Sequence, residues 1–320
     1  MIDLIKGKLI HKEKIELKLL SDRSKYVVEG KYNYSDKTHW YPLKTRLKNL
    51  FINVTEKGAT IGNSLHKYFN NLVSGENQNF NDFYFCDILY ALDVLEYELD
   101  YSLDETVLTN LEFGFNIDLD ICPSRFLDNN VLMHDTKSPC YDPKNDKNMK
   151  MKKFIYTEYE IKIYNKTLDQ SRYKEFIQQL KGTKILRIEI KYKSKKQINK
   201  LGIFSLADLR SPEIYNNLMT DFLRKYDPLL IIDSYNGNSL MSKKEREFIT
   251  NCTHPNYWIA LKEFKHSNTI LNHKNKLKKL IKKYDLDSWK ENLKKDILNK
   301  FQQLFNSNCY PENNNLLNIA

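Results

Sequence analysis

A tyrosine flanked by two lysines lies in a segment that alternates apolar and polar residues as a β-strand does. In residues 159–166, Tyr164 shares one face with Lys162 and Lys166, because successive side chains of a strand point to opposite sides. We expect this face to be exposed to solvent. A phenol between two ammonium groups is then placed to act as an oxygen nucleophile toward a phosphate.

Two further strands carry carboxylates on their polar faces. Glu189 lies on the polar face of residues 186–191, and Glu112 lies on that of residues 111–118. Packed side by side, these strands would bring both carboxylates to one face of a sheet. There they could hold a hard divalent cation, Mg²⁺ or Mn²⁺, that polarises a phosphodiester. His134, at the end of another expected strand, is a candidate third ligand.

Together these residue types predict metal-dependent cleavage of DNA through a phosphotyrosine bond. The phenol of Tyr164, with an ordinary pKa of about 10, must lose its proton as it attacks. We expect Lys162 and Lys166 to favour the phenolate. The products would be a 5′-phosphotyrosine and a free 3′-hydroxyl, and a reverse transfer would later rejoin the strand.

The charge of the chain is basic and unevenly distributed. The net charge is +10, yet residues 68–124 contain no Lys or Arg and hold twelve Asp and Glu. The remainder therefore carries an excess of positive charge typical of a nucleic-acid-binding protein. We expect the partner to be DNA, with residues 261–300 adding affinity through phosphate contacts. The candidate DNA-binding residues are Arg187, Lys191, Lys193, Lys195 and Lys196.

The order of these segments resembles that of the filamentous-phage gene II/X replication initiators and related phage and plasmid initiators. The chain opens with Met-Ile-Asp in residues 1–3 and continues through an apolar helical run at 85–99 into the acidic strand at 111–113. The strand at 161–166 follows, and after it comes the strand at 186–190, which runs into residues 200–209. These last two segments carry the sharpest part of the resemblance. It covers about residues 1–210.

The resemblance implies a rolling-circle replication initiator that nicks one strand at an origin and stays bound to its 5′ end. Tyr164 matches the nucleophile of the family, and Glu112 and Glu189 occupy its acidic strand positions. The resemblance implies that the DNA partner is a single strand or a supercoiled origin, and that a host replication helicase and polymerase would be further partners. The chain lacks the His-hydrophobic-His triplet that binds metal in many other rolling-circle nickases.

Two other functions remain open from the residues alone. Glu189-Ile190-Lys191 is also a Glu-x-Lys element, and with Asp169 it is compatible with a metal-dependent nuclease that uses activated water. A non-catalytic DNA-binding protein would use the same basic surface but would not need clustered carboxylates. His66 could serve as a metal ligand in either catalytic case.

Hydrophobic periodicity predicts an α+β fold with a mostly antiparallel sheet and flanking helices. We assign residues 1–210 to a catalytic nicking domain and residues 211–320 to a basic helical C-terminal region. The expected strands besides those above are 10–20, 26–34 and 50–54. The expected helices are 82–101, 212–226, one beginning at Ser242, and a helical stretch at 271–305.

Cysteine usage and hydropathy indicate a cytoplasmic protein. The five cysteines are widely spaced, and lysines interrupt the apolar run near the N-terminus, so we expect free thiols and no secretory segment. No apolar run approaches the ~20 residues that span a bilayer, and we expect no membrane partner.

Overall fold

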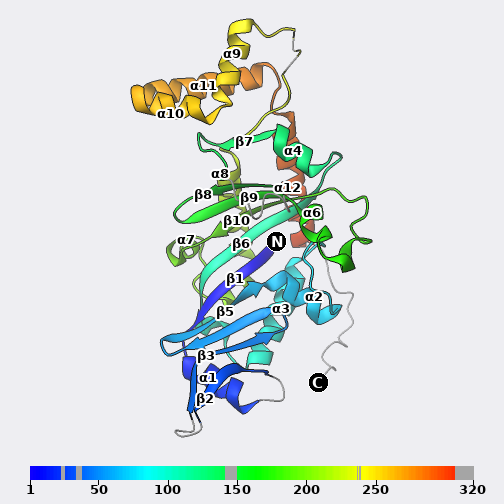
Figure 1. Cartoon of the computed structure of the whole chain (residues 1–320), viewed down its shortest axis with the longest axis vertical. Helices are drawn as coiled ribbons and strands as arrows, with labels where there is room; N and C mark the ends of the chain where they lie inside the picture. Colours follow the sequence, from blue (N-terminus) through cyan, green and yellow to red (C-terminus); the bar gives the residue numbers. More distant parts are fainter. Residues whose placement is uncertain (23–25, 34–37, 141–149, 236, 238, 307–320) are drawn as a thin grey trace.

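A nine-stranded antiparallel sheet forms the centre of the molecule (Figure 1). The computed structural model describes residues 1–22, 26–33, 38–140, 150–235, 237 and 239–306. In sheet order the strands are β2 (Glu29–Asn33), β3 (Thr38–Leu47), β4 (Leu50–Thr55), β5 (Gly58–Ser64), β1 (Ile2–Leu9), β6 (Thr106–Asp118), β10 (Ile185–Tyr192), β9 (Tyr159–Asn165) and β8 (Met151–Ile155). β7 (Val131–His134) and β11 (Leu229–Ile231) form a separate antiparallel pair. The predicted α+β class is confirmed.

Helices flank this sheet and continue beyond one end of it (Figure 1). They are α1 (Lys12–Ser21), α2 (Leu65–Val73), α3 (Phe85–Leu99), α4 (Pro123–Asn129), α6 (Lys166–Ser171), α7 (Lys195–Asn199), α8 (Pro212–Tyr226), α9 (Lys243–Cys252), α10 (Pro255–Phe264), α11 (Ser267–Lys283) and α12 (Ser288–Asn306). Short 3-10 turns lie at Leu103–Glu105, Lys174–Phe176 and Ala207–Arg210.

The strand predicted at residues 10–20 is wrong, because this segment is helix α1. Its charged and apolar residues alternate locally, which suggested a strand. The structure buries Ile15 and Leu19, four residues apart, while Leu17 is exposed. That spacing is the period of a helix, and packing of the two buried side chains against the core selects it.

The apolar face of the central strands packs against two helices from the C-terminal half of the chain. Phe113 of β6 contacts Phe222 of α8, and Phe115 contacts Phe301 of α12, both ring pairs being edge-on. Helix α8 begins at Pro212 directly after Ser211, as the cap-then-proline pattern predicts. These helices bury one face of the sheet, and the polar side chains of β6, β9 and β10 lie on the opposite face.

The C-terminal region contributes to two different hydrophobic cores. Helices α8 and α12 belong to the main core with the sheet. Helices α9–α11 form a smaller core with residues around β7 and β11: Met133, Ile232, Met241, Ile249, Cys252, Trp258, Leu277, Leu280, Ile281 and Leu286. The predicted boundary at residue 210 therefore does not coincide with the separation of the cores.

Among the described helices, none combines the length and apolar content that a membrane span requires.

The cysteines depart in part from the expectation of free thiols. Cys122, Cys140 and Cys252 are free. Cys86 is disulfide-bonded, so the expectation is wrong for that residue. Cys309 lies outside the described residues.

Candidate active site

Polar side chains of β6, β10 and β9 gather on one face of the sheet, as their alternation predicts. In the strand register Glu189 lies opposite Lys162 of β9, and Arg187 lies opposite Tyr164. On the other side Glu189 faces Gly114 of β6, where a Cβ atom would meet the Cβ of Glu189 at 2.6 Å. A glycine is therefore required beside this carboxylate.

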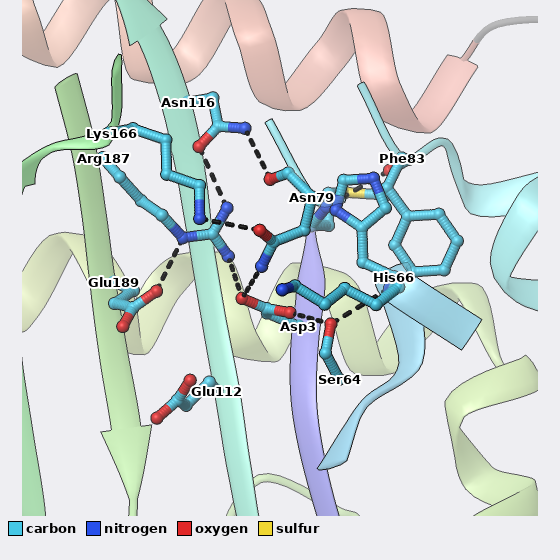
Figure 2. A network of polar contacts seen from close by, with 12 residues as sticks. Asp3, Ser64, His66, Asn79, Phe83, Glu112, Asn116, Lys166, Arg187 and Glu189 are labelled. Carbon is cyan, nitrogen blue, oxygen red and sulfur yellow. Dashed lines mark hydrogen bonds and ion pairs between the residues drawn. The ribbon is translucent and has the colours of Figure 1, made fainter. Parts of the chain in front are cut away.

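Three carboxylates from three adjacent strands converge on this face (Figure 2). Asp3 of β1, Glu112 of β6 and Glu189 of β10 each offer an oxygen, and these oxygens lie within 4.8 Å of one another. All three side chains are buried. Oxygen ligands at this spacing suit a hard divalent cation, which binds carboxylates at about 2.0–2.6 Å. The sequence-based prediction that Glu112 and Glu189 share a face is confirmed, and the triad could hold a metal ion.

Two cations of the protein already bridge these carboxylates. Lys162 donates to both Glu112 and Glu189 over 2.8 Å. Arg187 donates to Asp3 over 2.9 Å and to Glu189 over 2.6 Å. Because a buried charge is stable only when it is paired, these interactions allow a concentrated negative charge to exist inside the fold.

The carboxylates titrate differently because their cationic partners differ. Burial opposes the charge of Glu189, but Lys162 and Arg187 outweigh it and lower its pKa to about 2. Burial is likewise outweighed at Asp3, where Arg187 and Lys166 hold the pKa well below its usual range. At Glu112 burial and the neighbouring Glu189 prevail and raise the pKa. Glu112 is therefore the carboxylate whose charge a bound metal ion would stabilise most.

Tyr164 lies on this polar face but is buried, contrary to the expected exposure. Its side chain is 6% exposed. Within the described residues its hydroxyl has no hydrogen-bond partner. Burial, followed by the charge of Glu189, raises the pKa of Tyr164 well above its ordinary value. The phenol is protonated in the resting site.

The two lysines form their hydrogen bonds with groups other than the phenol. Lys162 is engaged with the carboxylates, and the expectation that it favours the phenolate is wrong for this arrangement. Lys166 begins α6 and donates to Asn79 and Asp169, with its nitrogen 5.7 Å from the Tyr164 ring centre. Burial and then Arg187 lower the pKa of Lys166 to about 8. A fraction of this amine is therefore neutral near neutral pH.

His134 does not lie with the triad, so its prediction as a metal ligand is corrected. Its Nε2 donates to the carbonyl oxygen of Lys225 over 2.9 Å, and its Nδ1 lies 2.5 Å from the hydroxyl of Tyr156. Both ring nitrogens are occupied. His66 lies closer to the site but uses its Nε2 on Asn81 and stacks on Phe83, so neither histidine joins the three carboxylates.

Asp3 is the candidate metal ligand that motif reading left unassigned. It accepts hydrogen bonds from Ser64, from Asn79 over 2.8 Å and from Arg187. The feature of the sequence that could have pointed to Asp3 is that it is a single carboxylate inside the apolar run of residues 1–5. The neighbouring sequence does not assign Asp3 to the site, because the residues that surround it in the fold come from distant parts of the chain.

The candidate DNA-binding residues divide by exposure. Arg187 is 3% exposed and belongs to the carboxylate cluster, so the expectation of an accessible DNA contact is wrong for it. Lys191 is half-buried near Glu112, and Lys193 pairs with Glu160. Lys195 and Lys196 are exposed on α7, and they remain candidates for phosphate contacts.

The Glu-x-Lys alternative is met only in part by the geometry. Lys191 Nζ lies 3.4 Å from Glu112, close to the triad. Asp169, its expected acidic partner, instead pairs with Lys166 and Arg172. The third carboxylate of the cluster is Asp3.

No family model matches the chain, and no curated protein is significantly similar to it.

Proposed function

We propose that this chain is a rolling-circle replication initiator that nicks one strand of DNA through a phosphotyrosine at Tyr164. The observation that carries the proposal is the convergence of Asp3, Glu112 and Glu189 on the sheet face that also holds a tyrosine hydroxyl without a partner among the described residues. Among the described residues, the fully buried side-chain atoms without a partner belong to Asn49, Asn53, Thr106 and Gln170, so the Tyr164 hydroxyl keeps some contact with solvent. A phosphate entering this site would supply the missing partner.

The reaction is a transesterification. The Tyr164 oxygen attacks the phosphorus, the bond from phosphorus to the 3′ oxygen breaks, and the leaving oxygen takes a proton from water to become a 3′-hydroxyl. The phenol proton is released to water, because Lys166 lies over the ring, 5.7 Å from its centre, and donates to Asn79 and Asp169. Rejoining is the reverse attack by a 3′-hydroxyl on the phosphotyrosine.

A divalent cation held by the three carboxylates would polarise the scissile phosphate. The all-oxygen ligand set suits Mg²⁺ or Mn²⁺. The protein's own cations have separate roles. Arg187 orients Asp3 and Glu189, and Lys162 keeps Glu112 and Glu189 together before an ion enters. An origin of replication as the DNA, with a host helicase and polymerase acting on the 3′ end, completes the proposal.

A second candidate is a metal-dependent nuclease in which water attacks the phosphate. The observation that favours it is the burial of Tyr164, which raises the pKa of the phenol and opposes its ionisation. In that case the same triad would hold the ion, and no covalent adduct would form.

Incubation with labelled single-stranded DNA and Mn²⁺, followed by denaturing electrophoresis, separates the two candidates. We expect a labelled protein adduct from the wild type and none from Tyr164→Phe. Tyr159→Phe is the matched control, since Tyr159 begins the same strand on the opposite face. If DNA is cleaved without forming an adduct, and if Tyr164→Phe still cleaves it, the water mechanism is established instead.

A further inference from the structure

A polar cavity of about 360 Å³ opens beside the carboxylates, between α2 and the β3–β4 turn. Asp3 and Glu112 form part of its lining and join it to the candidate active site. The rest of the wall is rich in amides and cations. Its other lining residues include Arg46, Lys48, Phe51, Lys67, Asn71 and Asn77.

The three cations of this wall are not neutralised by the protein. Within the described part of the chain, Arg46, Lys48 and Lys67 form no ion pair with any carboxylate, in contrast to Lys162 and Arg187 deeper in the site. Unpaired cations that line a polar cavity favour an anionic ligand. They lie beside a site proposed to act on a phosphodiester, and a second phosphate of the same strand provides that anion.

Lys48 occupies a backbone position that normally selects glycine. The β3–β4 hairpin pairs Leu47 with Leu50, so Lys48 and Asn49 are the two central residues of the turn. Lys48 has a φ of 54°, a conformation that a lysine adopts only at an energetic cost.

Two asparagines hold this turn against the active site. Asn49 donates to the carbonyl oxygen of Ser64 over 2.8 Å, and Asn63 donates to that of Asn49 over 2.9 Å. The hydroxyl of Ser64 in turn donates to Asp3. The position of Lys48 is therefore coupled through a short chain of hydrogen bonds to a carboxylate of the triad.

Phe51 gives the cavity an aromatic surface. It is 45% exposed, and the guanidinium of Arg46 lies over its ring at 4.6 Å. An exposed aromatic ring backed by arginine is a platform on which an unpaired base stacks, with little dependence on which base it is. A duplex keeps its bases paired and stacked on each other, so it cannot use this platform.

We propose that this cavity binds a nucleotide of single-stranded DNA next to the scissile phosphate. Lys48 and Lys67 bind its phosphate, and Phe51 stacks on its base. The inference rests on the proposed function for the position of the scissile bond, and it adds that the substrate must be unpaired at this nucleotide. Strand specificity then begins with the requirement for a melted site.

The test is binding of a fluorescent oligothymidylate, measured by anisotropy in EDTA so that no cleavage occurs. Lys48→Ala/Lys67→Ala should weaken binding and reduce the log–log salt slope by about 0.7 for each phosphate that is no longer neutralised. Phe51→Ala should weaken binding about tenfold, while Phe51→Tyr keeps the ring and restores it. Lys57→Ala is the matched control, because Lys57 is exposed at the opposite end of the β4–β5 hairpin.

Unchanged affinity and salt slope in the double lysine variant would overturn the proposal. So would equal loss of single-stranded and duplex binding in Phe51→Ala. Thermal unfolding of each variant confirms that the fold is retained. Binding is measured without metal and so does not depend on cleavage. If these variants lose binding, the proposed nucleotide-binding role of the cavity is supported even if the wild type cleaves no DNA. In that outcome the proposed nicking activity alone would fail.

Discussion

Arg187 of β10 donates a hydrogen bond of 2.9 Å to Asp3 of β1, joining residues 184 positions apart in the chain. Strand β6 separates their two strands in the sheet. The guanidinium also donates to Glu189 and to Asn116. The Arg187 side chain thus links the start of the chain to the central strand and to β10. It also offsets much of the negative charge of two carboxylates of the triad.

Removing this guanidinium should destabilise the protein strongly. Arg187→Leu leaves Asp3 and Glu189 buried without their main partner, which we expect to lower the free energy of unfolding by about 3–5 kcal/mol. Urea denaturation measures the effect. Arg172→Leu is the control, because Arg172 is exposed and pairs with Asp169 from the surface; it should change stability by about 1 kcal/mol or less. Equal effects of the two substitutions would contradict the proposed role of Arg187.

Metal binding should be visible as added stability. At a Mn²⁺ concentration of about 100 times Kd, the free energy of unfolding should rise by about 2.7 kcal/mol. Glu189→Gln and Asp3→Asn should abolish most of this gain. Glu160→Gln, a change at a carboxylate that pairs with Lys153 and Lys193 away from the triad, should keep it. If all variants respond alike to Mn²⁺, the triad is not the metal site.

Loss of the Tyr164 hydroxyl should abolish the covalent adduct and leave the fold intact. Since the hydroxyl has no hydrogen-bond partner among the described residues, Tyr164→Phe should change the free energy of unfolding by less than about 1 kcal/mol. Adduct formation and urea denaturation are measured on the same preparation. A large loss of stability would show that the phenol has a structural role.

Acidification should weaken the fold through Glu189 and Asp3. Both groups have a folded-state pKa below the unfolded value, that of Glu189 being about 2. Their stabilising contribution is therefore complete above the unfolded pKa of about 4.5 and is lost as pH falls toward 2. Unfolding midpoints in urea between about pH 2 and 6 measure this loss. Asp3→Asn should show a weaker pH dependence in that window, and an unchanged profile would contradict the assignment.

The basic C-terminal region should contribute to DNA affinity through its unpaired lysines. Lys278 and Lys279 are exposed on α11 and form no ion pair within the described residues. Lys282 pairs with Asp287 and Glu291, and Lys283 pairs with Glu245. Lys278→Ala/Lys279→Ala should therefore reduce DNA affinity and its salt dependence more than Lys282→Ala/Lys283→Ala.

Cleavage of a saturating short substrate should persist in both of these variants, because neither pair lies in the candidate active site. Filter binding at several salt concentrations, followed by single-turnover cleavage, measures the two properties. Equal affinities would place the DNA path elsewhere on the surface, with Lys195 and Lys196 as the next residues to change.

The local pattern of apolar and polar residues was sufficient to predict much of the candidate site. Alternation in residues 111–118, 159–166 and 186–191 predicted the three strands and the sharing of one face by Glu112, Tyr164 and Glu189. A side-chain period of two depends only on neighbouring residues. Helix α8 and the start of α9 at Ser242 followed from local capping for the same reason.

Only the tertiary structure decided which residues complete the site and how they titrate. Placement of β1 between β5 and β6 brings Asp3 to the carboxylates and leaves His134 elsewhere. Burial of the polar face turns Lys162 and Arg187 into internal ion pairs and raises the pKa of Tyr164. Strand order and burial depend on contacts between residues far apart in the chain, and neither is encoded in the spacing of any one segment.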